Sequence, residues 1–473
     1  MIPNPSRRFL LAAGAASAAW PGLRGSARAA VGRTSRLTVE RRTIEVNGRA
    51  ASVFGIRQPD GVPGLVLDPG QPFAVEVANR CGEPTIVHWH GQTPPSLQDG
   101  VAETGGALIE PGATLAYGFP ARPGTHWMHS HHGLQEQALM AAPLIVRTAE
   151  DLRADVQEVT VLLHDFSFRD PAELLASLTG GTATGPGAPP MPGMAMAPEP
   201  SGQDLNDVEY DAYLANDRTL DDPVVVRTAQ GGRVRLRLIN GATTTAFWID
   251  TGALDGTVVA ADGNPVRPVS GRRFPLAQGQ RLDILVTLPG DGGAFPILAQ
   301  REGDRRRTGI VLASPGAVVR KLSGMADDAA PAVDNSLERR LVAAAPLAAR
   351  GGGVTHKVAL TGTMTPYVWS LDDRTWADHR PLHIARGQRV VLEMSNRGGM
   401  AHPMHLHGHH FQVVGLDGSP LSGAMRDTVL VPARGSVTVV FDADNPGRWL
   451  FHCHNLFHMA TGMMTEVAYD GVA

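Results

Sequence analysis

Residues 449–463 read Trp-Leu-Phe-His-Cys-His-Asn-Leu-Phe-His-Met-Ala-Thr-Gly-Met, and this stretch decides what the rest of the chain must build. Its apolar beginning predicts a strand, on which successive side chains point to opposite faces. Cys453 then faces one way, while His452 and His454 face the other. A thiolate on one face and two imidazoles on the other could bind two separate metal sites, joined by a few covalent bonds.

The cysteine side of this strand predicts a copper site. Two histidines and a cysteine in one plane, with a weak methionine ligand, form the blue-copper arrangement. Cys453 and His458 would supply two of the equatorial ligands and Met463 the weak one, and His402 is the candidate for the third. Structural zinc sites favour several cysteines, whereas this chain has only Cys453 and Cys81.

Histidine carries most of the remaining information. Of the 18 histidines, 14 lie in four clusters, at 88–90, 126–132, 402–410 and 452–458. Four H-x-H pairs place two imidazoles on the same strand face, and they are His88/His90, His129/His131, His405/His407 and His452/His454. Nitrogen ligands without carboxylates suit copper better than magnesium, calcium or manganese. Because two pairs lie near each end of the chain, we expect the first and last parts to meet.

Composition excludes several classes of protein. The 473 residues carry a net charge of −4, which argues against a general binder of nucleic acid or anionic membranes. Two cysteines cannot form a disulfide framework, and Cys81 is expected to be a buried core thiol. Beyond the N-terminus no apolar run is long enough to span a membrane.

The chain divides into three blocks of short alternating strands, predicted at 36–148, 155–315 and 354–473. With 54 glycines and 36 prolines, the composition favours turn-rich β structure. Each block holds a glycine followed by a strand pattern, at Gly70, Gly232 and Gly387. The repetition predicts an all-β protein with three copies of one sandwich or Greek-key domain.

Two further segments are predicted between and within these blocks. Residues 316–353 read as a linker whose alanine content favours a helix. Residues 180–203 read as an insertion rich in glycine and proline, and it contains Met191, Met194 and Met196.

The N-terminus reads as an export signal. Arg7 and Arg8 precede an alanine-rich apolar stretch and an A-x-A cleavage site that ends at Ala29. Residues 1–29 are therefore predicted to be a twin-arginine signal peptide, read by the twin-arginine export machinery. The predicted destination is the periplasm.

Taken together, the motifs resemble those of the three-domain multicopper oxidases, which include laccases, bacterial cuprous oxidases and spore-coat laccases. The similarity extends across the whole mature chain, including the metal-free middle domain. It is carried by His88-Trp-His-Gly91, Gly124-Thr-His-Trp-Met-His-Ser-His131, His402-Pro-Met-His-Leu-His-Gly-His409 and His452-Cys-His454 with His458, Gly462 and Met463. The resemblance implies three cupredoxin-like Greek-key β-sandwich domains, with a copper cluster between the first and third.

The resemblance also implies a set of ligands for four coppers. It implies a type 1 site of His402, Cys453, His458 and Met463, and a type 2 site of His88 and His405. It implies a type 3 pair held by His90, His129, His131, His407, His452 and His454. Asp99 occupies the position of a carboxylate near the cluster and is a candidate for proton delivery; its Asp-Gly context fits a simple turn equally well.

The implied activity is one-electron oxidation of a small reductant coupled to four-electron reduction of dioxygen to water. The reductant could be a phenol, an aromatic amine or Cu(I). A laccase would pass electrons into His458 or His402 through a shallow exposed patch, whereas a cuprous oxidase for copper tolerance would use the methionines of the insertion. Asp427 is expected near the rim of the type 1 site, where it could serve either reductant.

Departures from the family pattern leave alternatives open. Met459 stands where bacterial relatives often carry a glutamate, which puts the proton relay in question. A copper nitrite reductase would lack most of the H-x-H pairs, and a non-catalytic cupredoxin scaffold would lack the ligand set. The extra histidines are expected to pack around the sites or lie at the surface, and they are His126, His132, His409 and His410.

Overall fold

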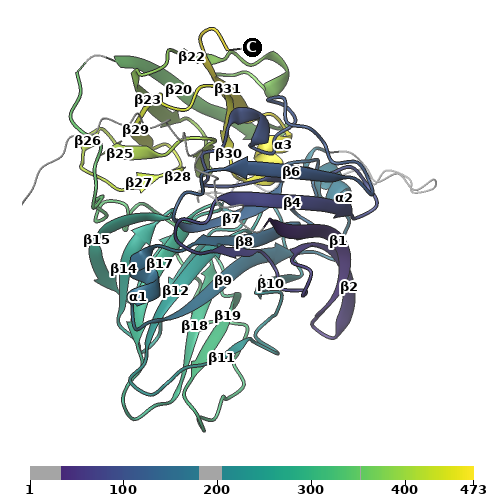
Figure 1. Cartoon of the computed structure of the whole chain (residues 1–473), viewed down its shortest axis with the longest axis vertical. Helices are drawn as coiled ribbons and strands as arrows, with labels where there is room; N and C mark the ends of the chain where they lie inside the picture. Colours follow the sequence, from purple (N-terminus) through teal and green to yellow (C-terminus); the bar gives the residue numbers. More distant parts are fainter. Residues whose placement is uncertain (1–33, 181–204, 352, 473) are drawn as a thin grey trace, which may run out of the picture. The chain divides into compact units, whose positions relative to one another are not determined.

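The computed structural model describes residues 34–180, 205–351 and 353–472. The predicted signal peptide and the three methionines of the predicted insertion lie outside these residues. The regular secondary structure of the described chain is mostly strands, arranged in six sheets, with a few short helices (Figure 1). This confirms the predicted all-β class.

Two four-stranded sheets form from the first part of the chain, in the orders β2-β1-β4-β6 and β3-β8-β7-β5. The strand bounds are β1 Ser35–Val46, β2 Arg49–Arg57, β3 Leu65–Leu67, β4 Phe73–Arg80, β5 Val87–His88, β6 Thr114–Phe119, β7 Gly124–Ser130 and β8 Ala141–Val146. Burial alternates along β4, as expected for a strand with one face on a core. A short 3-10 helix, η1 (Ser96–Gln98), leads into Asp99.

The middle part of the chain forms a six-stranded sheet, β10-β9-β12-β17-β14-β15, and a five-stranded sheet, β11-β19-β18-β13-β16. Their bounds are β9 Gln157–Phe166, β10 Ala212–Ala215, β11 Val225–Arg227, β12 Arg233–Asn240, β13 Phe247–Asp250, β14 Gly256–Ala261, β15 Asn264–Gly271, β16 Arg273–Leu276, β17 Arg281–Thr287, β18 Ala294–Arg301 and β19 Arg307–Ala313. The helices α1 (Ala149–Arg153) and α2 (Pro171–Leu178) flank β9 in sequence.

The last part forms a seven-stranded sheet, β21-β20-β23-β29-β25-β26 with β27 beside β25, and a five-stranded sheet, β22-β31-β30-β24-β28. Their bounds are β20 Gly353–Met364, β21 Tyr367–Leu371, β22 Leu382–Ile384, β23 Arg389–Asn396, β24 His402–Leu406, β25 Phe411–Leu416, β26 Ser419–Pro420, β27 Met425–Arg426, β28 Thr428–Val431, β29 Ser436–Asp442, β30 Arg448–Cys453 and β31 Met464–Tyr469. The short helices are η2 (Trp376–Asp378) and α3 (Leu456–Ala460).

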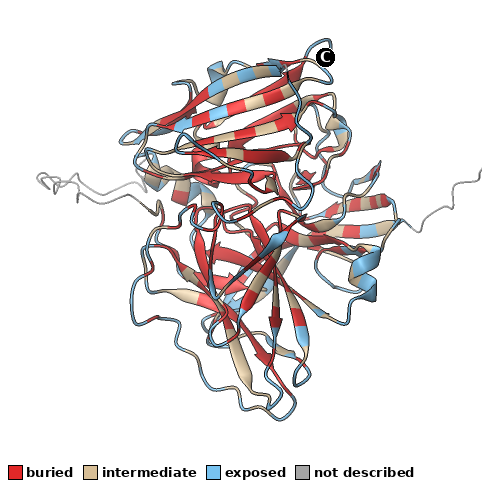
Figure 2. Ribbon diagram, turned by 90° about the vertical axis from the view of Figure 1, so that its left-hand side faces the viewer, coloured by how far each residue is buried: buried red, intermediate tan, exposed pale blue. Residues whose placement is uncertain are grey.

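The strands that follow Gly70, Gly232 and Gly387 occupy the same place in each part. Each of β4, β12 and β23 pairs in parallel with the first strand of its part, namely β1, β9 and β20. Each also pairs antiparallel on its other side, with β6, β17 and β29. The sequence echo therefore marks a topology that is repeated three times. Buried residues, red in Figure 2, are concentrated in the strands, and exposed residues lie mostly in the connecting loops.

The linker prediction was wrong in one respect. Among the described residues of 316–351 there is no helix. Isolated bridges instead join this segment to the middle part of the chain, through Glu302–Ala330, Arg306–Met325 and Val266–Ala343. Pairing with sheet edges outweighs the helix propensity of alanine here.

None of the helices among the described residues has the length and apolar character that a membrane span requires.

Candidate metal centre

The side chains of Cys453, His402 and His458 meet at one buried point. Cys453 ends β30, His402 begins β24, and His458 lies in α3. The Cys453 Sγ lies 3.7 Å from His402 Nδ1 and 3.6 Å from His458 Nδ1, and the two nitrogens are 3.1 Å apart. A single ion at about 2.0–2.3 Å from each atom fits this triangle, because these are ordinary metal–nitrogen and metal–sulfur distances.

Local structure explains how these residues converge. Asn455 caps α3 by accepting hydrogen bonds from the backbone N–H groups of Phe457 and His458, which turns the chain back after β30. The Cys453 N–H donates to the Met463 carbonyl at 3.0 Å, and the Met463 N–H donates to the His458 carbonyl at 2.9 Å. Met463 is fully buried, so its thioether belongs to the interior around Cys453.

Burial gives these groups the protonation states that a cation would select. It raises the pKa of the Cys453 thiol well above its ordinary value, so a thiolate at this place needs a cation beside it. Burial also lowers the pKa of His402 well below its ordinary value, which keeps the imidazole neutral and able to bind metal.

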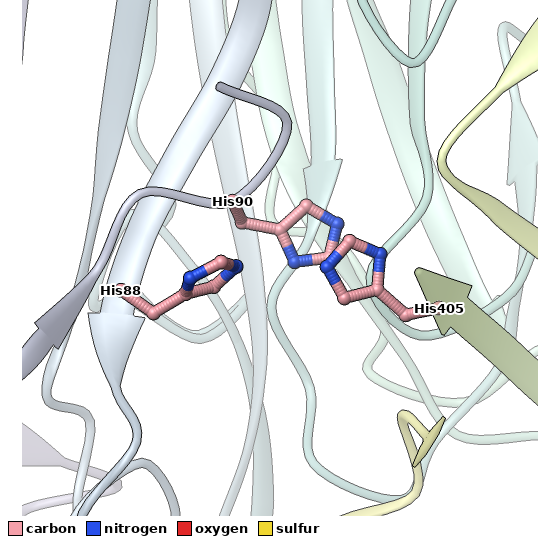
Figure 3. A group of neighbouring side chains, drawn as sticks. All are labelled: His88, His90 and His405. Carbon is pink, nitrogen blue, oxygen red and sulfur yellow. The ribbon is translucent and has the colours of Figure 1, made fainter. Parts of the chain in front are cut away.

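The eight histidines of the H-x-H pairs gather at a second buried place. Strand register brings the pairs together, because His88 lies opposite His129 across β5 and β7, and His405 lies opposite His452 across β24 and β30. Their ligand atoms form three groups within which all atoms lie inside 4.8 Å. The groups are His90/His129/His454, His131/His407/His452 and His88/His90/His405. In the last of these, His88 lies beside the overlapping rings of His90 and His405 (Figure 3).

Several of these imidazoles are arranged as metal ligands usually are, with one nitrogen held by the protein and the other left free. The Nδ1 atoms of His88, His405 and His452 face the carbonyl oxygens of Asp99, Asp427 and Cys453, each at 2.9 Å. The Nε2 atoms of His88, His129, His131 and His405, which are buried, have no hydrogen-bond partner among the described residues. Unpaired nitrogens that converge in a buried site fit bound copper.

Burial keeps seven of the eight cluster histidines neutral. It lowers the pKa of His90, His129, His131, His405 and His407 well below the ordinary value, and that of His452 and His454 to about 3. Neighbouring imidazoles act in the same direction in every case. Neutral imidazole is the form that binds metal.

Two aspartates lie against the cluster. The Oδ2 atom of Asp99 lies 2.7 Å from His407 Nδ1, while its carbonyl accepts from His88. Asp99 therefore contacts His88 from the first part of the chain and His407 from the last part. The sequence predicted a carboxylate beside this cluster.

The expectation for Asp427 was wrong. It lies between β27 and β28, and β28 runs antiparallel to β24 with Thr428 opposite His405 and Val431 opposite His402. Asp427 is thus at the cluster end of β24, whereas His402 and the rim of its site are at the other end. Its Oδ1 atom lies 3.0 Å from His90 Nε2, and its carboxylate pairs with Arg281.

Sequence reasoning missed three residues of these sites, namely Glu136, Asp207 and Arg281. The carboxylate of Glu136 lies 2.9 Å from His129 Nδ1, and burial raises the pKa of Glu136 to about 7. The carboxylate of Asp207 lies 3.2 Å from His458 Nε2. Glu136 follows the His129/His131 pair closely, which was a usable signal, but nothing in the sequence around Asp207 or Arg281 pointed to a site.

The expected exposed patch at His458 and His402 is absent from the described surface, since both side chains are fully buried. Trp369 covers them. The centroid of its ring lies 4.0 Å from the centroid of the His458 ring and 5.1 Å from that of the His402 ring.

The extra histidines do not belong to the ligand groups found among the described residues. His126 faces the Pro123 carbonyl at 3.2 Å, His409 faces the Tyr469 hydroxyl at 2.7 Å, and His410 faces the Gly91 carbonyl at 2.9 Å. His126 and His409 are buried, whereas His410 and His132 are of intermediate exposure. Cys81 is a buried free thiol, as predicted.

Comparison with known proteins agrees with this geometry. Residues 38–151, 157–314 and 353–471 match three family models, each described as multicopper oxidase. The chain is 34% identical to "Multicopper oxidase MmcO" of Mycobacterium tuberculosis (strain ATCC 25618 / H37Rv), over 92% of this chain and 87% of that protein. It is 27% identical to "Copper resistance protein A" of Escherichia coli, over 92% of each. It is 26% identical to "Laccase-2" of Botryotinia fuckeliana, over 91% of this chain and 81% of that protein.

A solved structure supports the fold. The crystal structure of the laccase from Botrytis aclada is similar with a TM-score of 0.76 at 23% identity, covering 93% of this chain and 88% of that one. This similarity confirms the predicted cupredoxin-like architecture.

Proposed function

Because this chain belongs to the multicopper oxidase family, we propose how its own residues share the work of an oxidase that uses dioxygen. As a member of that family it binds copper and couples oxidation of a reducing substrate to reduction of oxygen. The observation that carries the proposal is the pair of buried ligand sets on opposite faces of one strand, with Cys453 on one side and His452 and His454 on the other.

We propose that the chain holds four coppers. The type 1 copper would be held by His402, Cys453, His458 and Met463, and the type 2 copper by His88 and His405. The type 3 pair would be held by His90, His129 and His454 on one side, and by His131, His407 and His452 on the other. The grouping of free nitrogens into triads supports this division.

Bound copper would accept electrons one at a time from the reductant at the first site and pass them to the cluster, where four electrons and four protons convert one dioxygen into two waters. The residues of β30 provide the connection between the two sites. Cys453 is directly bonded through the backbone to His452 and His454, so electrons need cross only a few covalent bonds. Burial of these residues excludes water from that path.

Asp99 is our candidate for moving protons at the cluster. Its Oδ2 atom accepts the Nδ1 hydrogen of His407, while its buried Oδ1 atom has no hydrogen-bond partner among the described residues. The Oδ1 atom, 3.4 Å from His88 Nδ1, is the oxygen through which we propose that Asp99 passes protons.

The reductant is proposed to be a phenol, an aromatic amine or Cu(I). Oxidation of Cu(I) for copper tolerance is the second candidate function, and the similarity to a copper resistance protein favours it. Asp207 does not decide between them, because its carboxylate, 3.2 Å from His458 Nε2, is as fully buried as that histidine.

We also propose the organisation and location of the chain. Residues 36–148, 155–315 and 354–473 would be three cupredoxin domains, joined across 316–353, and only the first and third would supply ligands. Residues 1–29 would direct folded protein through the twin-arginine pathway to the periplasm.

The test is copper analysis and oxygen consumption by the copper-loaded protein, given Cu(I) or a methoxyphenol. We expect four coppers per chain and water as the product, with no accumulation of hydrogen peroxide. Cys453→Ser should abolish oxygen consumption, while Cys81→Ser, which alters the other buried thiol, should leave it unchanged. Absence of copper or oxygen consumption in the wild-type protein would refute the proposal.

The same assay separates the two reductants. Turnover of Cu(I) that exceeds turnover of the methoxyphenol and is lost on deletion of residues 188–200 would establish a cuprous oxidase. Faster turnover of the phenol that ignores the deletion would establish a laccase.

A further inference from the structure

Arg281 lies at the start of β17, in the part of the chain that supplies no copper ligand, yet it reaches the histidine cluster. Its side chain is fully buried. The guanidinium donates to Asp427 with both terminal nitrogens, Nη1 at 2.7 Å to Oδ1 and Nη2 at 2.5 Å to Oδ2. It also donates to the carbonyls of Thr125 at 3.2 Å and Gly279 at 2.9 Å. One side chain thus joins three distant parts of the sequence.

Asp427 and its neighbour Thr428 hold two cluster histidines. The Asp427 Oδ1 atom faces His90 Nε2 at 3.0 Å, and the Asp427 carbonyl faces His405 Nδ1 at 2.9 Å. The Thr428 hydroxyl lies 3.2 Å from His90 Nε2 and 3.1 Å from His405 Nδ1. The two imidazoles stack with ring centroids 3.8 Å apart and planes 12° from parallel. His90 comes from the beginning of the chain and His405 from near its end.

His90 differs from five other cluster histidines in the nitrogen it leaves free. Protein acceptors face Nδ1 of His88, His129, His405, His407 and His452, which directs Nε2 of each toward the cluster. In His90 the carboxylate of Asp427 faces Nε2, and Nδ1 is the nitrogen without a partner. A neutral imidazole carries one N–H, so a carboxylate that accepts from Nε2 leaves the lone pair on Nδ1.

Close packing leaves the Arg281–Asp427 pair little freedom. A Cβ built at Gly91 would lie 2.6 Å from Arg281 Nη2 and 3.0 Å from Asp427 Oδ2, so the backbone beside His90 rests directly on the pair. Asp262 approaches from the other side and accepts from the backbone N–H groups of Asp427 and Thr428, each at 3.3 Å. Buried ion pairs contribute little net stability against well-packed apolar residues, so stability alone is a weak reason for this one.

We propose that Arg281 is a positioning residue for the copper cluster, which through Asp427 determines that His90 presents Nδ1 to the metal. This inference rests on the proposed function. A bidentate guanidinium holds the carboxylate in one plane, and lysine cannot reproduce that geometry. The middle part of the chain, which binds no metal in this scheme, would thereby control the geometry of a site formed by the other two.

The test compares Arg281→Met and Arg281→Lys with Arg237→Met. Arg237 is a matched control, since it lies on the adjacent strand β12, is equally buried and pairs with Asp283 at 3.0 Å and with Glu158. Its hydrogen bonds and ion pairs among the described residues include no histidine. The readouts are copper per chain after dialysis against a graded chelator, and the electron paramagnetic resonance signals of the type 1 and type 2 coppers.

We expect both Arg281 variants to keep the type 1 signal and to lose cluster copper at about 10- to 100-fold lower chelator concentration, as typical for loss of a residue that orients a ligand. The type 2 signal should change, because His405 shares the Asp427 contact. Asp427→Asn should behave alike, and Arg237→Met should match wild type. If Arg281→Met does not fold, Arg281→Lys and Asp427→Asn decide the question.

Two results would overturn the inference. Cluster copper in the Arg281 variants could be as tightly held as in wild type, with an unchanged type 2 signal. Alternatively, Arg237→Met could lose copper to the same extent, which would mean that any damage to the buried ion pairs has this effect. A wild-type protein that binds no copper would instead refute the proposed function, so the two failures are distinguishable.

Discussion

Replacing Gly91 by alanine adds one methyl group beside His90, at a place where the structure leaves no room for it. Gly91 has φ +87°, and the added Cβ would lie 2.4 Å from His126 Nδ1 and 2.6 Å from Arg281 Nη2. A non-glycine residue in the left-handed region costs about 1–2 kcal/mol. Relief of the clash requires His126 and the Arg281–Asp427 pair to move, and breaking a buried ion pair costs about 3–5 kcal/mol. The expected total is therefore about 4–7 kcal/mol.

Gly48→Ala is the control for the cost of placing a non-glycine residue in the left-handed region. Gly48 has φ +80° in the turn between β1 and β2, and its Cβ would meet no atom within 4 Å. Gly48→Ala should therefore cost only about 1–2 kcal/mol. The difference between the two variants isolates the clash at about 3–5 kcal/mol.

Thermal unfolding of the copper-free variants measures this difference. Unfolding about 440 residues changes the entropy by about 0.9 kcal/mol/K, so a clash of about 3–5 kcal/mol separates the two Tm values by about 3–5 °C. Copper retention should fall in Gly91→Ala and stay at the wild-type level in Gly48→Ala. Equal Tm values for the two variants would refute the reasoning, because they would show that the ion pair yields to a methyl group without cost.

Three further outcomes are expected. Cys453→Ser should remove the blue absorption of the type 1 copper while copper analysis still finds the cluster coppers; joint loss of all coppers would contradict separate sites. Acid should destabilise the copper-free protein, because burial lowers the pKa of His452 and His454 to about 3 and the unfolded chain takes up these protons first, near pH 6.5. Each of these two histidines should lower the free energy of unfolding by about 2 kcal/mol at pH 5 relative to pH 7, as measured by denaturant unfolding. Identical unfolding free energies at both pH values would contradict this. Glu302→Gln should stabilise the protein on the order of 3 kcal/mol at pH 7 and much less at pH 4, because burial raises the pKa of Glu302 to about 8 and folding must keep it protonated; a variant less stable than wild type at pH 7 would be the opposite result.

The repeating parts of the fold were predictable because they depend on local patterns. Alternation of apolar and polar residues predicts strands, and the recurring unit after Gly70, Gly232 and Gly387 predicts three related topologies. The H-x-H pairs were equally informative, since the spacing of two places both imidazoles on one face of a strand whatever the strand pairs with.

Contacts between side chains that are far apart in the sequence could not be predicted, because tertiary packing determines them. Asp427 was expected at the wrong end of β24, because the register of β28 against β24 decides which histidine it approaches. Arg281 and Asp427 are 146 positions apart, and Asp207 lies 248 positions from its partner Asn455. One sequence carries no signal for such pairs. The prediction of a helix in the linker was wrong for a related reason. Pairing partners available only in the folded protein outweigh alanine's preference for helix.

The meeting of the two ends of the chain makes metal binding a form of reversible crosslinking. His407 and Asp99 share a hydrogen bond although they are 308 positions apart, and the imidazoles around them come from the same two regions. A metal ion held between such regions closes a long loop, as a disulfide would, and so restrains unfolding. Unlike a disulfide, this link strengthens with the concentration of free metal, by about 4 kcal/mol at a thousandfold excess over Kd. Resistance to proteolysis would then report how much copper the surroundings contain.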